Sequence, residues 1–202
     1  MKLFYRFAQT SSFLYFRLFH RLEVHGLCNI PSEGSFILAS NHSSYFDPPA
    51  LGCKLPRNLH YFARDSLFFW PLGVLIHNLN SIPVNRSQLD FRTLKRVLKV
   101  LASGDPLLVF PEGTRSVNGQ LGSGKKGIGL LLAKSQATVI PARVIGGHRV
   151  LGKGMLLPRM GRKLIIKYGN PIPMSDLDPG KSDPERYETI SSRVLSAISS
   201  IR

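Results

Sequence analysis

The sequence predicts an α/β fold in which helices cover a β-sheet. Short apolar runs typical of buried strands alternate along the chain with longer segments whose apolar residues recur every three or four positions, as in helices. The chain has 202 residues, enough for one domain that buries a substantial core. Neither an internal repeat nor a low-complexity linker divides it.

Residues 1–22 are predicted to form an amphipathic, basic and aromatic segment that contacts a membrane. No acidic residue occurs before Glu23, and leucines recur every four positions from 14 to 22, as expected for a helix lying among lipid headgroups. The polar residues 9–12 are expected to divide the segment into two short helices. Its charges leave about ten uncharged residues between them, whereas a bilayer-spanning helix needs about 20 apolar residues.

Two other interpretations of this segment stay open. The presence of Arg and Ser and the absence of acids also match a mitochondrial presequence, and the helices could simply pack on the core. A secretory signal is disfavoured because the apolar stretch is interrupted and no small-residue cleavage site follows it.

The remaining elements are assigned from hydrophobic periodicity. Each predicted strand is a short apolar or alternating run, and the strands are expected at 36–39, 58–63, 107–110, 138–144 and 163–168. Each predicted helix has one apolar side, and the helices are expected at 94–101, 127–133 and 184–201. Gly104 is suited to end the first of these helices, and Ser182 and Glu185 stand at capping-box spacing for the last.

A histidine and an aspartate stand five residues apart directly after the strand predicted at 36–39. The segment reads Asn41-His42-Ser43-Ser44-Tyr45-Phe46-Asp47-Pro48. A carboxylate at this spacing can hold an imidazole and stabilise its protonated form, and Asp47 followed by proline is typical of a helix N-cap. The similarly spaced His60 and Asp65 are interpreted as structural, because His60 lies inside an alternating run and Asp65 or Ser66 is expected to cap the next helix.

A second polar segment, Pro111-Glu112-Gly113-Thr114-Arg115-Ser116, follows the strand predicted before it and should emerge where open α/β sheets bind ligands. Gly113 permits close backbone approach and Thr114 offers a hydroxyl. Arg115 carries a fork of donors suited to phosphate or carboxylate, which Glu112 is expected to hold in place. We therefore predict an anion site here; the alternative is a polar turn with a surface Arg–Glu pair.

Together the two segments resemble the glycerolipid acyltransferase family, the lysophosphatidate acyltransferases that acylate 1-acylglycerol 3-phosphate. Residues 41–47 look like the family's His-four-residues-Asp block, and residues 110–116 match its second signature without a substitution. Two weaker blocks at 81–86 and 139–143 also fit, and all four occur in the expected order. Asn85 stands where the family usually has an acidic residue.

The resemblance implies a mixed, largely parallel sheet flanked by helices, formed by an acyltransferase domain at 23–202 after the membrane-contacting helices at 1–22. It implies that His42, oriented by Asp47, is the general base that takes the proton from the free hydroxyl of a lysophospholipid. That oxygen attacks the thioester of acyl-CoA or acyl carrier protein, and lysophosphatidate gives phosphatidate. The donor is a substrate, and neither a cofactor nor a metal is expected.

The acceptor phosphate is expected to bind Arg115, Arg86 and Lys126, and Glu112 is expected to orient the arginine or an acceptor hydroxyl. Gly113 and Thr114 complete the expected substrate-binding set. Residues 122–127 fall short of the P-loop pattern, so nucleotide hydrolysis is not expected. Residues 67–76 are apolar on all sides and are predicted to form a core helix broken by Pro71; the wall of an acyl-chain groove and a further membrane contact are the alternatives.

The formal net charge of +15 requires an anionic partner, and an anionic membrane, an acidic carrier protein or coenzyme A phosphates would each satisfy it. Another lysolipid acceptor, a thioesterase and a basic nucleic-acid-binding module are the alternative functions. The last explains the charge but not the four ordered blocks, and no nucleic acid partner is expected. Cys28 and Cys53 do not suggest a disulfide framework or a zinc site. The expected location is the cytoplasmic face of a membrane, as a peripheral or monotopic protein.

Overall fold

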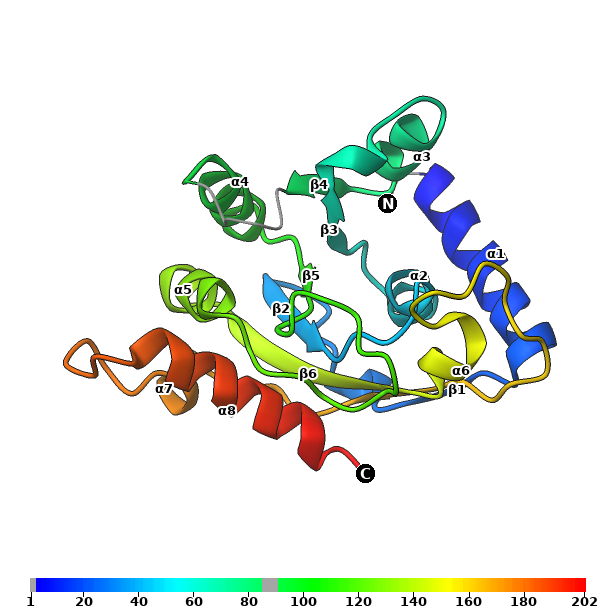
Figure 1. Ribbon diagram of the computed structural model, residues 1–202. Helices are drawn as coiled ribbons and strands as arrows, with labels where there is room; N and C mark the ends of the chain where they lie inside the picture. Colours follow the sequence, from blue (N-terminus) through cyan, green and yellow to red (C-terminus); the bar gives the residue numbers. More distant parts are fainter. Residues whose placement is uncertain (1–2, 85–90) are drawn as a thin grey trace.

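The computed structural model describes residues 3–84 and 91–202, and its described part contains a seven-stranded sheet between two layers of helices (Figure 1). The strands are β1 (Glu23–His25), β2 (Phe36–Ser40), β3 (His60–Arg64), β4 (Ser81–Val84), β5 (Leu107–Val109), β6 (Thr138–Ile145) and β7 (Ile165–Tyr168). The α-helices are α1 (Leu3–His20), α2 (Asp47–Gly52), α3 (Leu72–Asn78), α4 (Phe91–Ala102), α5 (Lys126–Ser135), α6 (Gly147–Leu151), α7 (Met174–Leu177) and α8 (Arg186–Ser200). Two short 3₁₀ helices are η1 (Leu27–Asn29) and η2 (Asp65–Leu67).

The strand order is β1-β7-β6-β2-β5-β3-β4, and every neighbouring pair is parallel except β6 and β7. The predicted mixed, largely parallel sheet is therefore confirmed. Strand β2 lies in the middle, with β5 on one side and β6 on the other, and Ala39 pairs with Val109 of β5. The polar segments that follow β2 and β5 consequently leave the sheet side by side at the same edge. The short edge strands β1 and β4 were not predicted.

Side chains of the central strands alternate between two apolar cores, as strand geometry requires. Phe36 and Leu38 of β2 belong to the core beneath α1, α2 and α6, whereas Ile37 and Ala39 belong to the core beneath α4, α5, α7 and α8. Figure 1 shows the first group of helices on the right of the sheet and the second on the left. Burial on both faces explains why the run at 36–39 is apolar without interruption.

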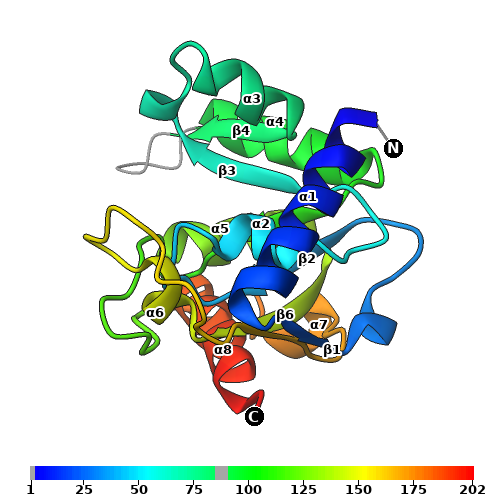
Figure 2. The ribbon, with the colours of Figure 1, turned by 90° about the vertical axis from the view of Figure 1, so that its right-hand side faces the viewer.

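Helix α1 is continuous from Leu3 to His20, so the expected division into two short helices at residues 9–12 is wrong. The side-chain amide of Gln9 donates hydrogen bonds to the carbonyl oxygens of Gly52 and Leu55 at 2.7 and 2.8 Å, near the carboxyl end of α2. The polar residue thus satisfies backbone groups of a neighbouring helix instead of interrupting its own. Figure 2 shows α1 running across the front of the molecule.

The outer side of α1 is apolar and basic. Tyr5, Phe16 and His20 are buried against the rest of the protein. The exposed apolar residues of the helix are Leu3, Phe4, Phe7, Leu14, Leu18 and Phe19. Within residues 3–84 and 91–202, no helix combines the length and the apolar character needed to cross a bilayer.

Residues 67–76 do not form the expected core helix. Pro71 precedes α3 instead of breaking a longer helix, and no residue of α3, which is described throughout, is buried. Phe69 and Trp70 are exposed, while Leu67 and Ile76 line a cavity of about 820 Å³. The apolar residues of this segment therefore line a cavity or lie on the surface instead of forming part of the core.

The helix caps predicted at residues 182–185 and at Asp65 or Ser66 are wrong. Helix α8 begins at Arg186, and Asp183 accepts hydrogen bonds from the backbone amide of Glu185 at 2.8 Å and from the Thr189 hydroxyl at 3.3 Å. The expected capping box at Ser182 and Glu185 is not formed among the described residues. Likewise, Asp65 is the first residue of η2, whose N-cap is Arg64, and its side chain accepts a hydrogen bond from the Ser66 amide at 2.8 Å.

Gly129 of α5 contacts the backbone of α8 so closely that a Cβ atom there would lie 1.8 Å from the Tyr187 carbonyl oxygen. We predict that Gly129→Ala lowers the free energy of unfolding by about 1–3 kcal/mol, because the two helices must move apart. Urea unfolding measures the change. Lys134→Ala, at an exposed position of the same helix, is the control and should change stability by less than about 0.5 kcal/mol. Equal stability of the two variants would contradict the prediction.

Candidate active site

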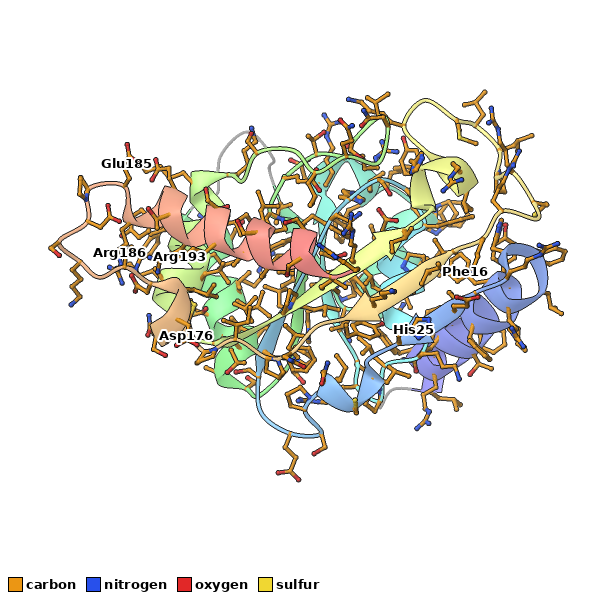
Figure 3. All side chains as sticks on the ribbon, turned by 90° about the horizontal axis from the view of Figure 1, so that it is seen from below. Phe16, His25, Asp176, Glu185, Arg186 and Arg193 are labelled. Carbon is orange, nitrogen blue, oxygen red and sulfur yellow. The ribbon has the colours of Figure 1, made fainter. Side chains whose placement is uncertain are left out.

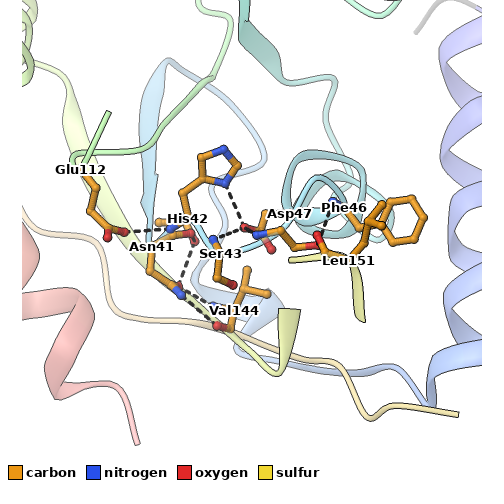
Figure 4. Close-up of polar contacts among 10 residues, drawn as sticks. Asn41, His42, Ser43, Phe46, Asp47, Glu112, Val144 and Leu151 are labelled. Atoms are coloured by element: carbon orange, nitrogen blue, oxygen red, sulfur yellow. Dashed lines mark hydrogen bonds and ion pairs between the residues drawn. The ribbon is translucent and has the colours of Figure 1, made fainter. Parts of the chain in front are cut away.

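The two polar segments are joined at the backbone of His42. The His42 amide donates a hydrogen bond to Oε1 of Glu112 at 2.9 Å, and the His42 carbonyl oxygen accepts one from the Ser116 amide at 2.7 Å. Figure 4 shows the Glu112 carboxylate reaching His42 from the neighbouring loop. Because both bonds involve main-chain atoms, they fix the position from which the imidazole projects.

Glu112 has a structural role that differs from the expected one. Its side chain is 3% exposed, and its second oxygen, Oε2, accepts a hydrogen bond from the Gly122 amide at 2.8 Å. Among the described residues, the expected contact between Glu112 and the Arg115 fork is absent; the alternative, in which Glu112 orients an acceptor hydroxyl, stays a prediction. The carboxylate instead holds three segments of backbone together.

Asp47 fixes the ring of His42. Its Oδ2 lies 2.9 Å from His42 Nδ1 and also accepts hydrogen bonds from the amides of Ser43 and Ser44, at 2.6 and 2.7 Å (Figure 4). Asp47 is 1% exposed and is the first residue of α2, not its N-cap, so its carboxylate turns back into the preceding loop. Because the Asp47 carboxylate accepts a hydrogen bond from the Nδ1–H group, the lone pair of the neutral imidazole is at Nε2.

The imidazole is held between this carboxylate and an aromatic ring. The His42 and Phe110 rings are stacked with centroids 3.9 Å apart and planes 13° from parallel. Asn41 anchors the segment to β6. Its side-chain amide donates a hydrogen bond to the Val144 carbonyl at 2.9 Å and accepts one from the Val144 amide at 2.7 Å (Figure 4). These contacts keep the ring in one orientation, as a positioned base requires.

Arg115 carries a buried group that lacks a partner. Its guanidinium lies over the Tyr45 ring, with Cζ 3.4 Å from the centroid. Its Nη1 is buried and has no hydrogen-bond partner within the described ranges. An unpaired buried guanidinium nitrogen is costly, and an anionic ligand would relieve that cost.

His42 and Arg115 line the same cavity, whose volume is about 820 Å³. At this end the wall also includes Phe110, Gly113 and Lys125. The rest of the wall comes from α1, α2, β3, η2, α3, β4 and the start of α5, and its residues include Ala8, Pro48, Tyr61, Leu67, Ile76 and Ile128. The cavity therefore joins a polar, basic end to a mainly apolar one.

The other expected site residues lie in different settings. Lys126 lines the cavity, but its Nζ forms an ion pair with Glu188 of α8 at 2.9 Å, which raises the pKa of the lysine. Thr114 is exposed and is not part of the cavity wall among the described residues. Arg86 lies outside the described residues.

Sequence reasoning did not assign roles to Tyr45, Phe110 and Lys125. Tyr45 and Phe110 lie inside the segments at 41–47 and 110–116, and their aromatic side chains were the only sequence signal that could have indicated stacking on Arg115 and His42. Lys125 precedes α5 and lines the cavity, and its Cγ packs near Gly113. No local pattern distinguishes it from Lys126, because the difference depends on the distant Glu188.

Several known acyltransferases are similar to this chain. A crystal structure of the 1-acyl-sn-glycerophosphate acyltransferase PlsC from Thermotoga maritima is similar, with a TM-score of 0.74 and 26% identity over 96% of this chain and 76% of that one. A 1-acyl-sn-glycerol-3-phosphate acyltransferase of Bacillus subtilis is 29% identical, covering 85% of this chain and 84% of that protein. A chloroplastic 1-acyl-sn-glycerol-3-phosphate acyltransferase of Arabidopsis thaliana is 32% identical over 75% of this chain.

The chain spans only 42% of the length of the Arabidopsis protein and 40% of a similar chloroplastic protein from Brassica napus. The model of the acyltransferase family matches residues 21–145, which include both polar segments and the strands that place them. This match covers more than half of the chain. The chain therefore belongs to the acyltransferase family.

Proposed function

We propose that this protein transfers a fatty acyl group from a thioester donor, acyl-CoA or acyl carrier protein, to the free hydroxyl of 1-acylglycerol 3-phosphate. The product is phosphatidate. The observation that carries the proposal is that His42, fixed by Asp47, and the unpaired Nη1 of Arg115 belong to one cavity. The names of the Bacillus and Thermotoga relatives point to the same acceptor.

The chemistry requires a base and an oriented acceptor. Nε2 of His42 takes the proton of the acceptor hydroxyl while the oxygen attacks the thioester carbonyl carbon. The new C–O bond forms, the C–S bond breaks, and the proton passes from the imidazolium to the departing thiolate. Thiols have pKa values near 8.5, so the thiolate leaves readily, and Asp47 stabilises the imidazolium while it exists.

The phosphate of the acceptor binds Arg115. Its guanidinium stacks on Tyr45 and offers Nη1, so the ligand supplies the missing partner. Lys125 at the same end of the cavity adds positive charge, and Arg86 remains a proposed contributor outside the described residues. Glu112 acts through the backbone of His42, since its oxygens accept main-chain hydrogen bonds.

An acyl chain occupies the apolar part of the cavity between α1, α2 and β3. The exposed apolar residues of α1, together with Arg6 and Arg17, contact the bilayer from which the lipid acceptor comes. We propose the cytoplasmic face for this contact, because anionic lipids there attract basic segments. The reaction uses the donor as a substrate and needs no further cofactor.

We predict that His42→Ala lowers kcat for acyl transfer by about 10²–10⁴-fold, because the hydroxyl loses its base. Asp47→Asn should lower kcat by a similar factor, since an amide cannot hold the same ring tautomer and stabilise its charge. Labelled acyl-CoA with a panel of lysophospholipids provides the assay, and circular dichroism checks folding. Near-normal turnover by a folded His42→Ala protein would refute the mechanism. Free fatty acid as the main product of the unaltered protein would point to a thioesterase.

Arg115→Ala should raise the KM for 1-acylglycerol 3-phosphate by about tenfold or more, because a charge-assisted hydrogen bond to phosphate is lost. Arg115→Lys keeps the charge but not the fork of donors, so its KM for 1-acylglycerol 3-phosphate should lie between those of the unaltered protein and Arg115→Ala. The KM for the acyl donor serves as the internal control and should change little. An unchanged acceptor KM in Arg115→Ala would contradict the phosphate role.

Ala8→Phe places a large ring on the α1 wall of the cavity and should shift the preference towards shorter acyl chains. Competition between acyl-CoA donors of different length measures the shift. The matched control is Ala102→Phe, because Ala102 is exposed at the end of α4. A chain-length profile that is the same in both variants would place the acyl chain elsewhere.

A further inference from the structure

The connection between α6 and β7 carries the most exposed leucine of the described chain. Leu156 and Leu157 are 95% and 78% exposed, and Met160 is 54% exposed. In Figure 3 side chains project outwards from this connection, which follows the yellow helix α6. Because Leu156 and Leu157 are exposed side by side, they contribute little to the packing of the described chain, and such a surface is typical of a binding site for a partner.

The connection is held in shape at its base. The Arg159 amide donates to the Val150 carbonyl at 2.8 Å and closes the loop. The sulfur of Met155 folds back to the Gly152 amide, 3.2 Å away. Leu156 and Leu157 therefore project from a loop whose backbone conformation is fixed by hydrogen bonds.

The same loop adjoins α1. The Gly161 amide donates to the Phe19 carbonyl at 2.8 Å, and the Tyr15 hydroxyl lies 3.9 Å from the sulfur of Met160. Figures 1 and 2 both place the connection beside the carboxyl-terminal half of α1. Its exposed apolar residues thus continue the exposed apolar surface of that helix.

The charged residues of the loop at 153–162 are all basic. Lys153, Arg159 and Arg162 are exposed and form no ion pair within the described parts of the chain. From residue 113 to residue 175 the sequence has no Asp or Glu. Protruding leucines flanked by unpaired basic residues match an anionic bilayer, in which the leucines enter the apolar layer and the cations contact the phosphates.

We propose that residues 153–162 form a second membrane-contacting element, in which Leu156 and Leu157 insert into an anionic bilayer beside α1. A bilayer fits better than an acidic protein because the apolar surface is convex at the loop and continuous with α1. The element does not depend on the chemistry at His42. With contacts from both the helix and the adjoining loop, the protein is held on the membrane in one orientation.

Sedimentation with vesicles of equimolar phosphatidylcholine and phosphatidylglycerol tests the proposal on the full chain. The double variant Leu156→Ser, Leu157→Ser should bind at least about tenfold more weakly, because two leucines no longer enter the apolar layer. Phe91→Ser is the matched control, since Phe91 is 80% exposed on α4, far from the loop in Figure 1. Equal binding of the double variant and the unaltered protein would overturn the proposal.

Insertion is measured directly with Leu157→Trp in a Trp70→Phe background, which leaves one indole. Its emission should shift to shorter wavelength with the anionic vesicles and should be quenched by brominated lipid. Unchanged emission while the protein binds vesicles would overturn the proposal. The same shift with acyl carrier protein and no lipid would also overturn it, in favour of a protein partner.

Acyl transfer on detergent-dispersed substrates separates this proposal from the proposed function. The double serine variant should keep the turnover of the unaltered protein there and lose it only on vesicle-borne acceptor. Loss of turnover in detergent would overturn the proposal by assigning the loop to the acyl-transfer machinery. If the unaltered protein transfers no acyl group but still binds vesicles through the loop, only the proposed function fails.

Discussion

The hydrogen bonds at the backbone of His42 are the constraint on which the site depends. Its amide and carbonyl are both bound by the segment after β5, through the Glu112 side chain and the Ser116 amide. Parallel pairing of β2 with β5 makes this possible, because both segments leave the sheet at one edge. His42, the proposed base, and Arg115, the proposed phosphate ligand, therefore belong to one rigid unit although they are 73 positions apart in sequence.

The cavity beside His42 and Arg115 has the polarity that the proposed substrates require. Its polar end contains a histidine with a free Nε2 lone pair and an arginine with an unpaired nitrogen, and its other end is apolar. A lysophospholipid with a terminal phosphate and a fatty thioester have the same division between charged and apolar parts. Exposed apolar and basic residues on α1 and on the loop at 153–162 form the proposed membrane contact of the same protein.

Much of the fold and the pairing of His42 with Asp47 could be predicted because those signals are local. The apolar runs at 36–39 and 107–110 identify central strands, and the spacing of five residues lets the carboxylate reach the ring. The role of Glu112 could not be predicted, since its partner at His42 is 70 residues away. The continuity of α1 was missed for the same reason: Gln9 reads as a helix breaker until its bonds to Gly52 and Leu55 are known.

The central claim is that one acceptor molecule reaches both His42 and Arg115. A crystal structure of the protein with 1-acylglycerol 3-phosphate tests it most directly. The account predicts the phosphate within hydrogen-bond distance of Arg115 Nη1 and the free hydroxyl about 2.6–3.2 Å from His42 Nε2. A phosphate bound away from Arg115, or a hydroxyl that cannot reach the imidazole, would contradict it.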